Sequence, residues 1–121
     1  MAKTILLVDD TSLIRSISSK AATEAGYNVV LASNGIEGLE KIKEHNIDIV
    51  FSDVNMPTMD GLDMVAEIKK NPAFSLIPIV MLTTEAKDEL EVKGKDLGIE
   101  TWLLKPFNKT KFLIILQKFF G

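Results

Sequence analysis

The sequence lacks cysteine and has few of the residues that mark special classes of protein. It has one tryptophan, one tyrosine, one histidine and four prolines among 121 residues. Without cysteine there is no disulfide, no thiolate metal site and no cysteine nucleophile. The first apolar run, Ile5–Val8, stops at two aspartates and is too short for a secretion signal or a membrane span. These absences favour a soluble, cytoplasmic protein with no membrane insertion.

An excess of positive charge is also absent. The chain has 14 basic and 17 acidic residues, for a net charge of −3, which argues against a protein that mainly binds nucleic acid. Its hydrophobic share of 46% is typical of a globular protein, and its length suits one domain. We therefore expect residues 1–121 to form one monomeric domain, with no room for an effector domain.

Short apolar runs alternate with segments of helical periodicity. A continuous run rich in valine, isoleucine and leucine is typical of a buried parallel strand. The expected strands are Thr4–Val8, Asn28–Ala32, Ile47–Ser52, Ile77–Leu82 and Thr101–Leu104. Strands that alternate with helices predict an α/β fold, in which helices cover both faces of a parallel sheet. Ligands of such sheets bind beyond the carboxyl ends of the strands.

The segments between the strands carry apolar stripes of helical period. The second helix should begin at Asn34, which with Glu37 resembles a capping box, and the third at Asp60. A fourth helix is expected over about residues 87–97. The stripe of the first helix, which should end before Gly26, comprises Ile14, Ile17, Ala21 and Ala25.

The last 21 residues differ in charge from the rest of the chain. They contain four lysines and no acid, whereas all 17 acidic residues lie before them. We expect a fifth helix over about residues 109–120, with Ile114 opposite its core stripe. Its basic side is either a solvated face or a contact with an acidic partner. The core stripe comprises Phe112, Ile115, Leu116 and Phe119.

Charged or hydroxyl side chains follow four of the five expected strands. They are Asp9 and Asp10, Asp53, Thr83 and Lys105. Neighbouring strands lie about 4.8 Å apart, so the acids at their ends can converge. Oxygen ligands without cysteine or a nearby histidine favour a hard cation, Mg²⁺ or Mn²⁺.

The same groups suit phosphoryl transfer. The charges of three carboxylates, a divalent cation and Lys105 sum to zero, so the pocket can receive a phosphoryl group. A carboxylate can act as the nucleophile and form an acyl phosphate, and the Thr83 hydroxyl can donate a hydrogen bond to a phosphoryl oxygen. Asp53 is the better candidate nucleophile because it stands alone on what should be the central strand. The residue types alone do not settle which aspartate is the nucleophile, and at least one of Asp9 and Asp10 must point at the ion.

Four motifs, in this order, resemble the receiver domain of two-component response regulators. They are ILLVDD (5–10), DVNMPTMDG (53–61), MLTTE (81–85) and WLLKPF (102–107). The resemblance covers the whole chain. It implies a flavodoxin-like (βα)5 fold with strand order 2-1-3-4-5 and a cis peptide bond between Lys105 and Pro106.

The resemblance also implies how the pocket works. Asp9 and Asp10 would hold Mg²⁺ together with Asp53 and the backbone carbonyl of Asn55. Asp53 would accept the phosphoryl group from a histidine kinase. The domain would catalyse only its own phosphorylation and dephosphorylation, and is otherwise not an enzyme.

Further roles follow from the same resemblance. Lys105 would contact the phosphoryl group, and Thr83 would be the switch hydroxyl. Trp102 stands where the best-known members have a tyrosine that changes rotamer. Asn55 and Glu85 flank the phosphoryl group at positions that tune its hydrolysis.

Within the family, a stand-alone chain with MLTTE (81–85), KGK (93–95) and a W-x-x-KPF ending is most similar to the chemotaxis regulators of the CheY type. That similarity implies a chemotaxis kinase as phosphoryl donor, the flagellar motor switch as target, and an auxiliary phosphatase. The signal would leave through the face of the fourth helix, fifth strand and fifth helix, where Ile114, Lys109 and Lys95 are the candidate partner surface.

Other functions remain open at this point. A phosphorelay shuttle or a phosphate sink would have the same pocket. A Mg²⁺-dependent aspartyl phosphatase of the haloacid dehalogenase kind needs an aspartate two residues after its nucleophile, where Asp9 is followed by Thr11. A flavodoxin-like cofactor binder would need a phosphate loop in place of the acidic DDTS (9–12), and a receiver that acts without phosphate would not need the complete set of pocket residues.

Overall fold

The computed structural model describes residues 2–84, 94–99 and 101–121. One parallel sheet has the strand order β2-β1-β3-β4-β5, which confirms the predicted fold. The strands are β1 (Thr4–Val8), β2 (Asn28–Ala32), β3 (Ile49–Asp53), β4 (Ile79–Thr83) and β5 (Thr101–Leu104). The predicted ranges of β3 and β4 were wrong at both ends. Each strand starts two residues later and ends one residue later, so Asp53 and Thr83 are themselves strand residues.

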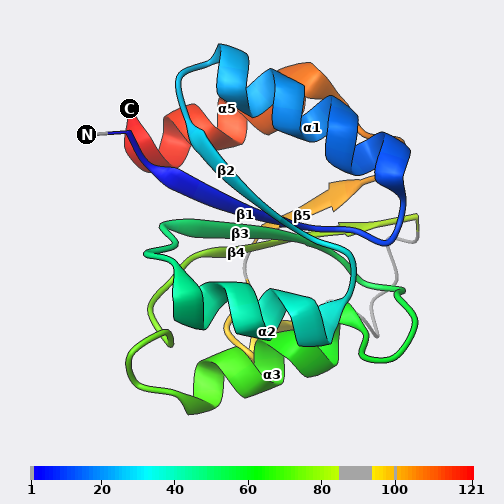
Figure 1. The fold of residues 1–121 in the computed structure, drawn as a ribbon, viewed down its shortest axis with the longest axis vertical. Coiled ribbons are helices and arrows are strands. Elements are labelled where there is room, and N and C mark those ends of the chain that lie inside the picture. The colour runs from blue at the N-terminus through cyan, green and yellow to red at the C-terminus, as the bar shows by residue number, and fades with distance from the viewer. Residues whose placement is uncertain (1, 85–93, 100) are drawn as a thin grey trace.

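Helices cover both faces of this sheet (Figure 1). α1 and α5 lie on one face, and α2 and α3 lie on the other. Residues 94–96 are also helical, but most of the predicted fourth helix lies outside the described residues. In the described ranges, no helix has the length and apolarity needed to cross a bilayer. The bounds are α1 (Ser12–Glu24), α2 (Gly35–Glu44), α3 (Gly61–Lys70) and α5 (Lys109–Phe120).

Three of these helices begin at a side chain that caps them. The carboxamide of Asn34 accepts a hydrogen bond from the Glu37 amide at 2.8 Å. Asp60 caps α3 and Asn108 caps α5 in the same way. The predicted capping box is therefore only half formed, because the Glu37 carboxylate accepts a bond from the Ser33 hydroxyl instead. These caps fix where α2, α3 and α5 leave the loops at the carboxyl edge of the sheet.

The core side of α1 differs from the predicted stripe. Ile17 is 44% exposed and Ala25 is also exposed, whereas Ser18, Ala21 and Ala22 are buried. Small side chains on that side let the helix approach the sheet closely. Ser18 tolerates burial because its hydroxyl donates a hydrogen bond to the Ile14 carbonyl at 2.6 Å.

The stripe of α5 is closer to the prediction. Phe112 and Leu116 are buried, and Phe112 packs edge-on against Phe51 with ring centroids 4.8 Å apart. Phe119 is 39% exposed, because the end of the helix turns Phe120 toward the core instead. Ile114 is 57% exposed, as its position opposite the stripe predicted.

Strand register brings the polar strand ends to one edge of the molecule. Val8 at the end of β1 pairs with Ser52, so Asp9 and Asp53 follow directly on neighbouring strands. Asp53 in turn pairs with Leu82, next to Thr83. The peptide bond between Lys105 and Pro106, just after β5, is cis as predicted. The start of β1 and the end of α5 lie together at the opposite end of the molecule (Figure 1).

Candidate functional site

Three aspartates converge at the carboxyl edge of the sheet. Carboxylate oxygens of Asp9, Asp10 and Asp53 lie within 4.8 Å of one another. Asp9 is 4% exposed and Asp53 is 5% exposed, whereas Asp10 is open to solvent. The pocket thus has two buried acids and one at its mouth.

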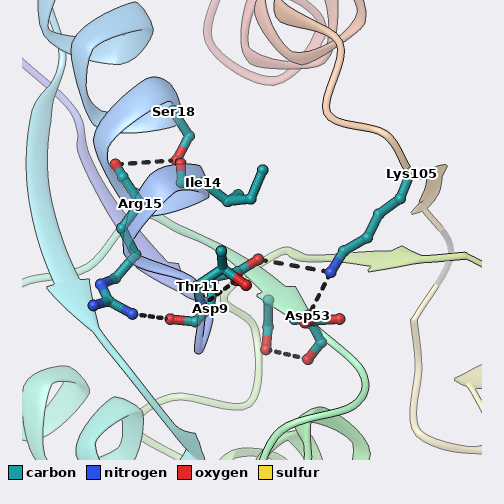
Figure 2. Close-up of polar contacts among 8 residues, drawn as sticks. Asp9, Thr11, Ile14, Arg15, Ser18, Asp53 and Lys105 are labelled. Carbon is teal, nitrogen blue, oxygen red and sulfur yellow. Dashed lines mark hydrogen bonds and ion pairs between the residues drawn. The ribbon is translucent and has the colours of Figure 1, made fainter.

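Lys105 joins the aspartates from the far side of the pocket (Figure 2). Its ammonium nitrogen lies 2.9 Å from Asp53 Oδ2 and 3.9 Å from Asp9 Oδ2. The Lys105 amide also donates a hydrogen bond to the Thr83 carbonyl at 2.8 Å, which fixes the lysine backbone against β4. One cation therefore lies among three acids, and the group as a whole keeps an excess of negative charge.

The electrostatics of Asp53 reflect this arrangement. Burial raises the pKa of its carboxyl above the ordinary value, Lys105 opposes the rise, and the charges of Asp9 and Asp10 add to it. The ionised form of Asp53 is thus destabilised by its surroundings. A second positive charge near the three carboxylates would offset that penalty.

The aspartate cluster fits a divalent cation. Its donors are all carboxylate oxygens, which suit hard cations such as Mg²⁺ or Mn²⁺. Asp9, Asp10 and Asp53 can each offer one oxygen to the same point. Asn55 is exposed in the loop that follows β3, and the role of its carbonyl as a ligand stays a prediction.

The other predicted site residues lie at different distances from the pocket. Thr83 ends β4 and is 3% exposed. Glu85 lies outside the described residues. Lys95 and Lys109 are exposed, and the Lys109 ammonium lies 3.6 Å from the carboxylate of Glu24 on α1. The roles predicted for these residues, as for Ile114, remain predictions.

Trp102 on β5 contacts a residue that sequence reasoning missed. Its indole is partly buried against the core on the side of α2 and α3, and it lies over Gly94. A Cβ on Gly94 would be 2.3 Å from Cζ2 of the indole, which is too close for any real side chain. The indole therefore fills space that a side chain at position 94 would need, so this packing requires glycine there. A glycine in a predicted helix was the available signal, since glycine costs a helix about 1 kcal/mol relative to alanine.

Arg15 was also missed, although it is the only arginine of the chain. Figure 2 shows its guanidinium extending from α1 to the backbone of Asp9. Every other basic residue counted in the sequence is a lysine, and this difference was the signal that could have identified Arg15.

Comparison with known proteins agrees with this geometry. The family model described as "Response regulator receiver domain" matches residues 5–117. The chain belongs to this family. The structure of chemotaxis protein CheY4 from Vibrio cholerae is similar to this receiver domain, with a TM-score of 0.94 and 39% identity over 98% of this chain and 99% of that one.

Curated relatives of the receiver domain differ in length. "Chemotaxis protein CheY1" of Helicobacter pylori is 35% identical over 119 residues, which cover 93% of this chain and 95% of that protein. "Probable transcriptional regulator ycf29" of Pyropia yezoensis is 33% identical over 117 residues, covering 97% of this chain. The receiver domain spans about half, 53%, of the latter protein. Similar domains thus occur in proteins close to this length and within longer ones.

Proposed function

We propose that this receiver domain is a signalling switch in which Asp53 accepts a phosphoryl group from a histidine kinase in the presence of Mg²⁺. One observation carries the proposal: three carboxylates converge within 4.8 Å, with Lys105 2.9 Å from the central one. Asp53 lies on the central strand, between the acids of β1 and the lysine after β5. It is therefore closer to Lys105 than Asp9 is, and it can share a cation with Asp9 and Asp10.

The described residues supply the nucleophile and one of the positive charges that the transfer needs. An Asp53 carboxylate oxygen attacks phosphorus, and an O–P bond forms while the N–P bond to the donor histidine breaks. The imidazole leaves with the electron pair and takes up a proton. Lys105 stabilises the charge on the phosphoryl oxygens, since transfer of this kind depends on position and neutralisation. A cation held by Asp9, Asp10 and Asp53 would supply further positive charge to the same oxygens.

The output would arise from packing next to the pocket. Phosphorylation adds negative charge and three acceptor oxygens, which can attract the Thr83 hydroxyl. Thr83 is buried and its strand pairs with β5, which carries Trp102. A movement of Thr83 would therefore change the space available to the indole, which packs against Gly94. The face made by residues 94–96, β5 and α5 would change in consequence. Leu104 is 54% exposed and Ile114 is 57% exposed on these elements, and both offer apolar contacts to a partner.

We base the proposed partners on the similarity to chemotaxis proteins. Similarity to chemotaxis proteins supports a chemotaxis kinase as donor, an auxiliary phosphatase, and the flagellar motor switch as target in the cytoplasm. A phosphorelay shuttle or phosphate sink is the second candidate, because it needs the same pocket. Of the proposed partner residues, Lys109 lies 3.6 Å from the carboxylate of Glu24, whereas Ile114 offers an exposed apolar side chain.

Phosphoryl labelling tests the proposed chemistry. The purified chain, incubated with a phosphohistidine donor or acetyl phosphate, should gain one phosphoryl group only when Mg²⁺ or Mn²⁺ is present. Intact-mass spectrometry measures the gain, and its loss in alkali identifies an acyl phosphate. Failure to label with either donor at saturating Mg²⁺ would overturn the proposal.

Substitution of Ile114 tests the output. Ile114→Lys should leave labelling of Asp53 unchanged but weaken binding of the beryllofluoride-treated chain to a flagellar motor switch protein by about tenfold or more, as for a buried interface anchor. Calorimetry measures the affinity, and Leu76→Lys, at a residue 93% exposed, is the matched control. Equal binding by Ile114→Lys and wild type contradicts this surface. Transfer of the phosphoryl group to a second histidine protein would favour the shuttle.

A further inference from the structure

Arg15 is the only arginine among 14 basic residues, and it lies beside the aspartate pocket. It is the fourth residue of α1, close to the amino end of the helix. A cation is mildly disfavoured there by the helix dipole, and a specific interaction offsets that cost. Figure 2 shows that interaction: the guanidinium Nη1 donates a hydrogen bond to the main-chain carbonyl of Asp9.

The carbonyl that Arg15 binds lies beyond the sheet. β1 pairs with both neighbouring strands as far as Val8. The amide of Asp9 still continues this pattern, because it donates to the Ala32 carbonyl at 3.1 Å. The carbonyl of Asp9 instead receives its hydrogen bond from α1, through Arg15. Arg15 thus supplies a hydrogen bond to the first main-chain carbonyl after the paired residues of β1.

This carbonyl belongs to the peptide group that joins Asp9 to Asp10, so a bond to it restrains the backbone that carries both side chains. The carboxylate of Asp9 has further support, since Oδ1 accepts from the Thr11 amide at 2.8 Å and Oδ2 faces Lys105. Within the part of the chain that the structure describes, the Asp10 carboxylate makes no hydrogen bond or ion pair. The direction of Asp10 therefore depends on the backbone that Arg15 holds.

We propose that Arg15 is a positioning residue for the cation site, which holds the peptide between Asp9 and Asp10 so that Asp10 points at the cation. This inference rests on the proposed function, because it concerns the same site. An outer partner that orients a ligand typically changes metal affinity by about tenfold to a hundredfold. The planar, always charged guanidinium suits this task better than the flexible ammonium of lysine.

The proposal and simple electrostatics predict opposite changes in cation affinity when Arg15 is removed. A positive charge next to a cation site repels the cation, so its removal alone should tighten cation binding. Loss of a positioning contact should weaken binding in spite of that relief. The direction of the change therefore separates the two roles.

The test is the Mn²⁺ affinity of the whole chain, measured by electron paramagnetic resonance of free Mn²⁺. We expect Arg15→Met to raise the Kd at least about tenfold, and Arg15→Lys, which keeps a cationic donor, to lie between Met and wild type. Thermal unfolding in EDTA should be nearly the same for all three. Lys20→Met, which removes the same charge elsewhere on α1, should leave the Kd unchanged or lower it.

Each other outcome is also decisive. Equal or tighter Mn²⁺ binding by Arg15→Met overturns the positioning role, and so does a loss of metal-free stability that accounts for the weaker binding. An Arg15→Lys variant no better than Arg15→Met also overturns it. Wild-type chain that binds no Mn²⁺ would instead refute the proposed cation site itself, whatever the variants do.

Discussion

Replacing Asp53 with asparagine should reduce phosphoryl labelling of the chain to background. The amide has nearly the shape of the carboxylate but is not a nucleophile toward phosphorus, so no acyl phosphate can form. Asp9 and Asp10 should not take over, because Lys105 lies 2.9 Å from Asp53 but 3.9 Å from Asp9. Intact-mass spectrometry after incubation with acetyl phosphate and Mg²⁺ measures the effect.

Asp60→Asn is the matched control for this experiment. Asp60 caps α3 by accepting a hydrogen bond from the Asp63 amide at 2.8 Å, and asparagine caps helices equally well. It removes a carboxylate from the loop after β3 without a change in the pocket, so labelling should persist. Persistent labelling of Asp53→Asn at Asp9 or Asp10 would contradict the assignment of Asp53.

The Asp53→Asn variant should also fold at least as stably as the metal-free wild type. The pKa of Asp53 is raised by burial, so the folded state binds a proton more readily than the unfolded state does. The stability that this group contributes is present below its unfolded pKa and is lost as the pH rises through its folded pKa. Asparagine mimics the protonated group. Thermal unfolding in EDTA at neutral pH checks this, and a lower Tm for the variant would contradict it.

Gly61→Ala should destabilise the domain by about 3 kcal/mol, at the upper end for overpacking. Gly61 is the first residue of α3, and a Cβ there would lie 2.1 Å from the backbone carbonyl oxygen of Asp53 and 2.7 Å from Met81 Cε. The backbone of β3 cannot move away easily, because it is a central strand with neighbours on both sides. Urea unfolding measures the loss, and we expect slower phosphoryl labelling as Asp53 is displaced.

Gly38→Ala is the comparison variant for the loss of stability expected of Gly61→Ala. Gly38 in α2 also has a close neighbour, but the nearest atom is Met64 Sδ at 2.6 Å, within a flexible side chain. Alanine gains about 1 kcal/mol of helix propensity there, which offsets part of the cost of moving the methionine. The net change should be much smaller than for Gly61→Ala. Equal losses at the two sites would show that contact with the Asp53 backbone is not the cause.

The close contact of α2 and α3 also explains why α2 contains a glycine at all. In the sequence, Gly38 is only an unfavourable residue in a helix. In the fold, Met64 and Val8 lie where a side chain at Gly38 would be. Helix propensity is local, whereas this requirement comes from two elements that are distant in the chain.

The sequence by itself determined the alternation of strands and helices, the strand order through the family resemblance of its motifs, and the polar residues at or just after the strand ends. Hydrophobic runs and helical periods are local properties, and the register of parallel strands brings their carboxyl ends to one edge. Asp9, Asp10, Asp53 and Lys105 could therefore be placed together before any coordinates.

Only the tertiary structure decided which surfaces are buried and which backbone groups need a partner. Ile17 is exposed and Ser18 is buried because α1 packs on the sheet through its side of small residues, which includes Ala21 and Ala22. Arg15 donates a hydrogen bond to the Asp9 carbonyl, and Trp102 packs against Gly94. Both contacts form only when the elements that carry these residues pack together. Such contacts depend on distances between elements, which no local pattern of residues encodes.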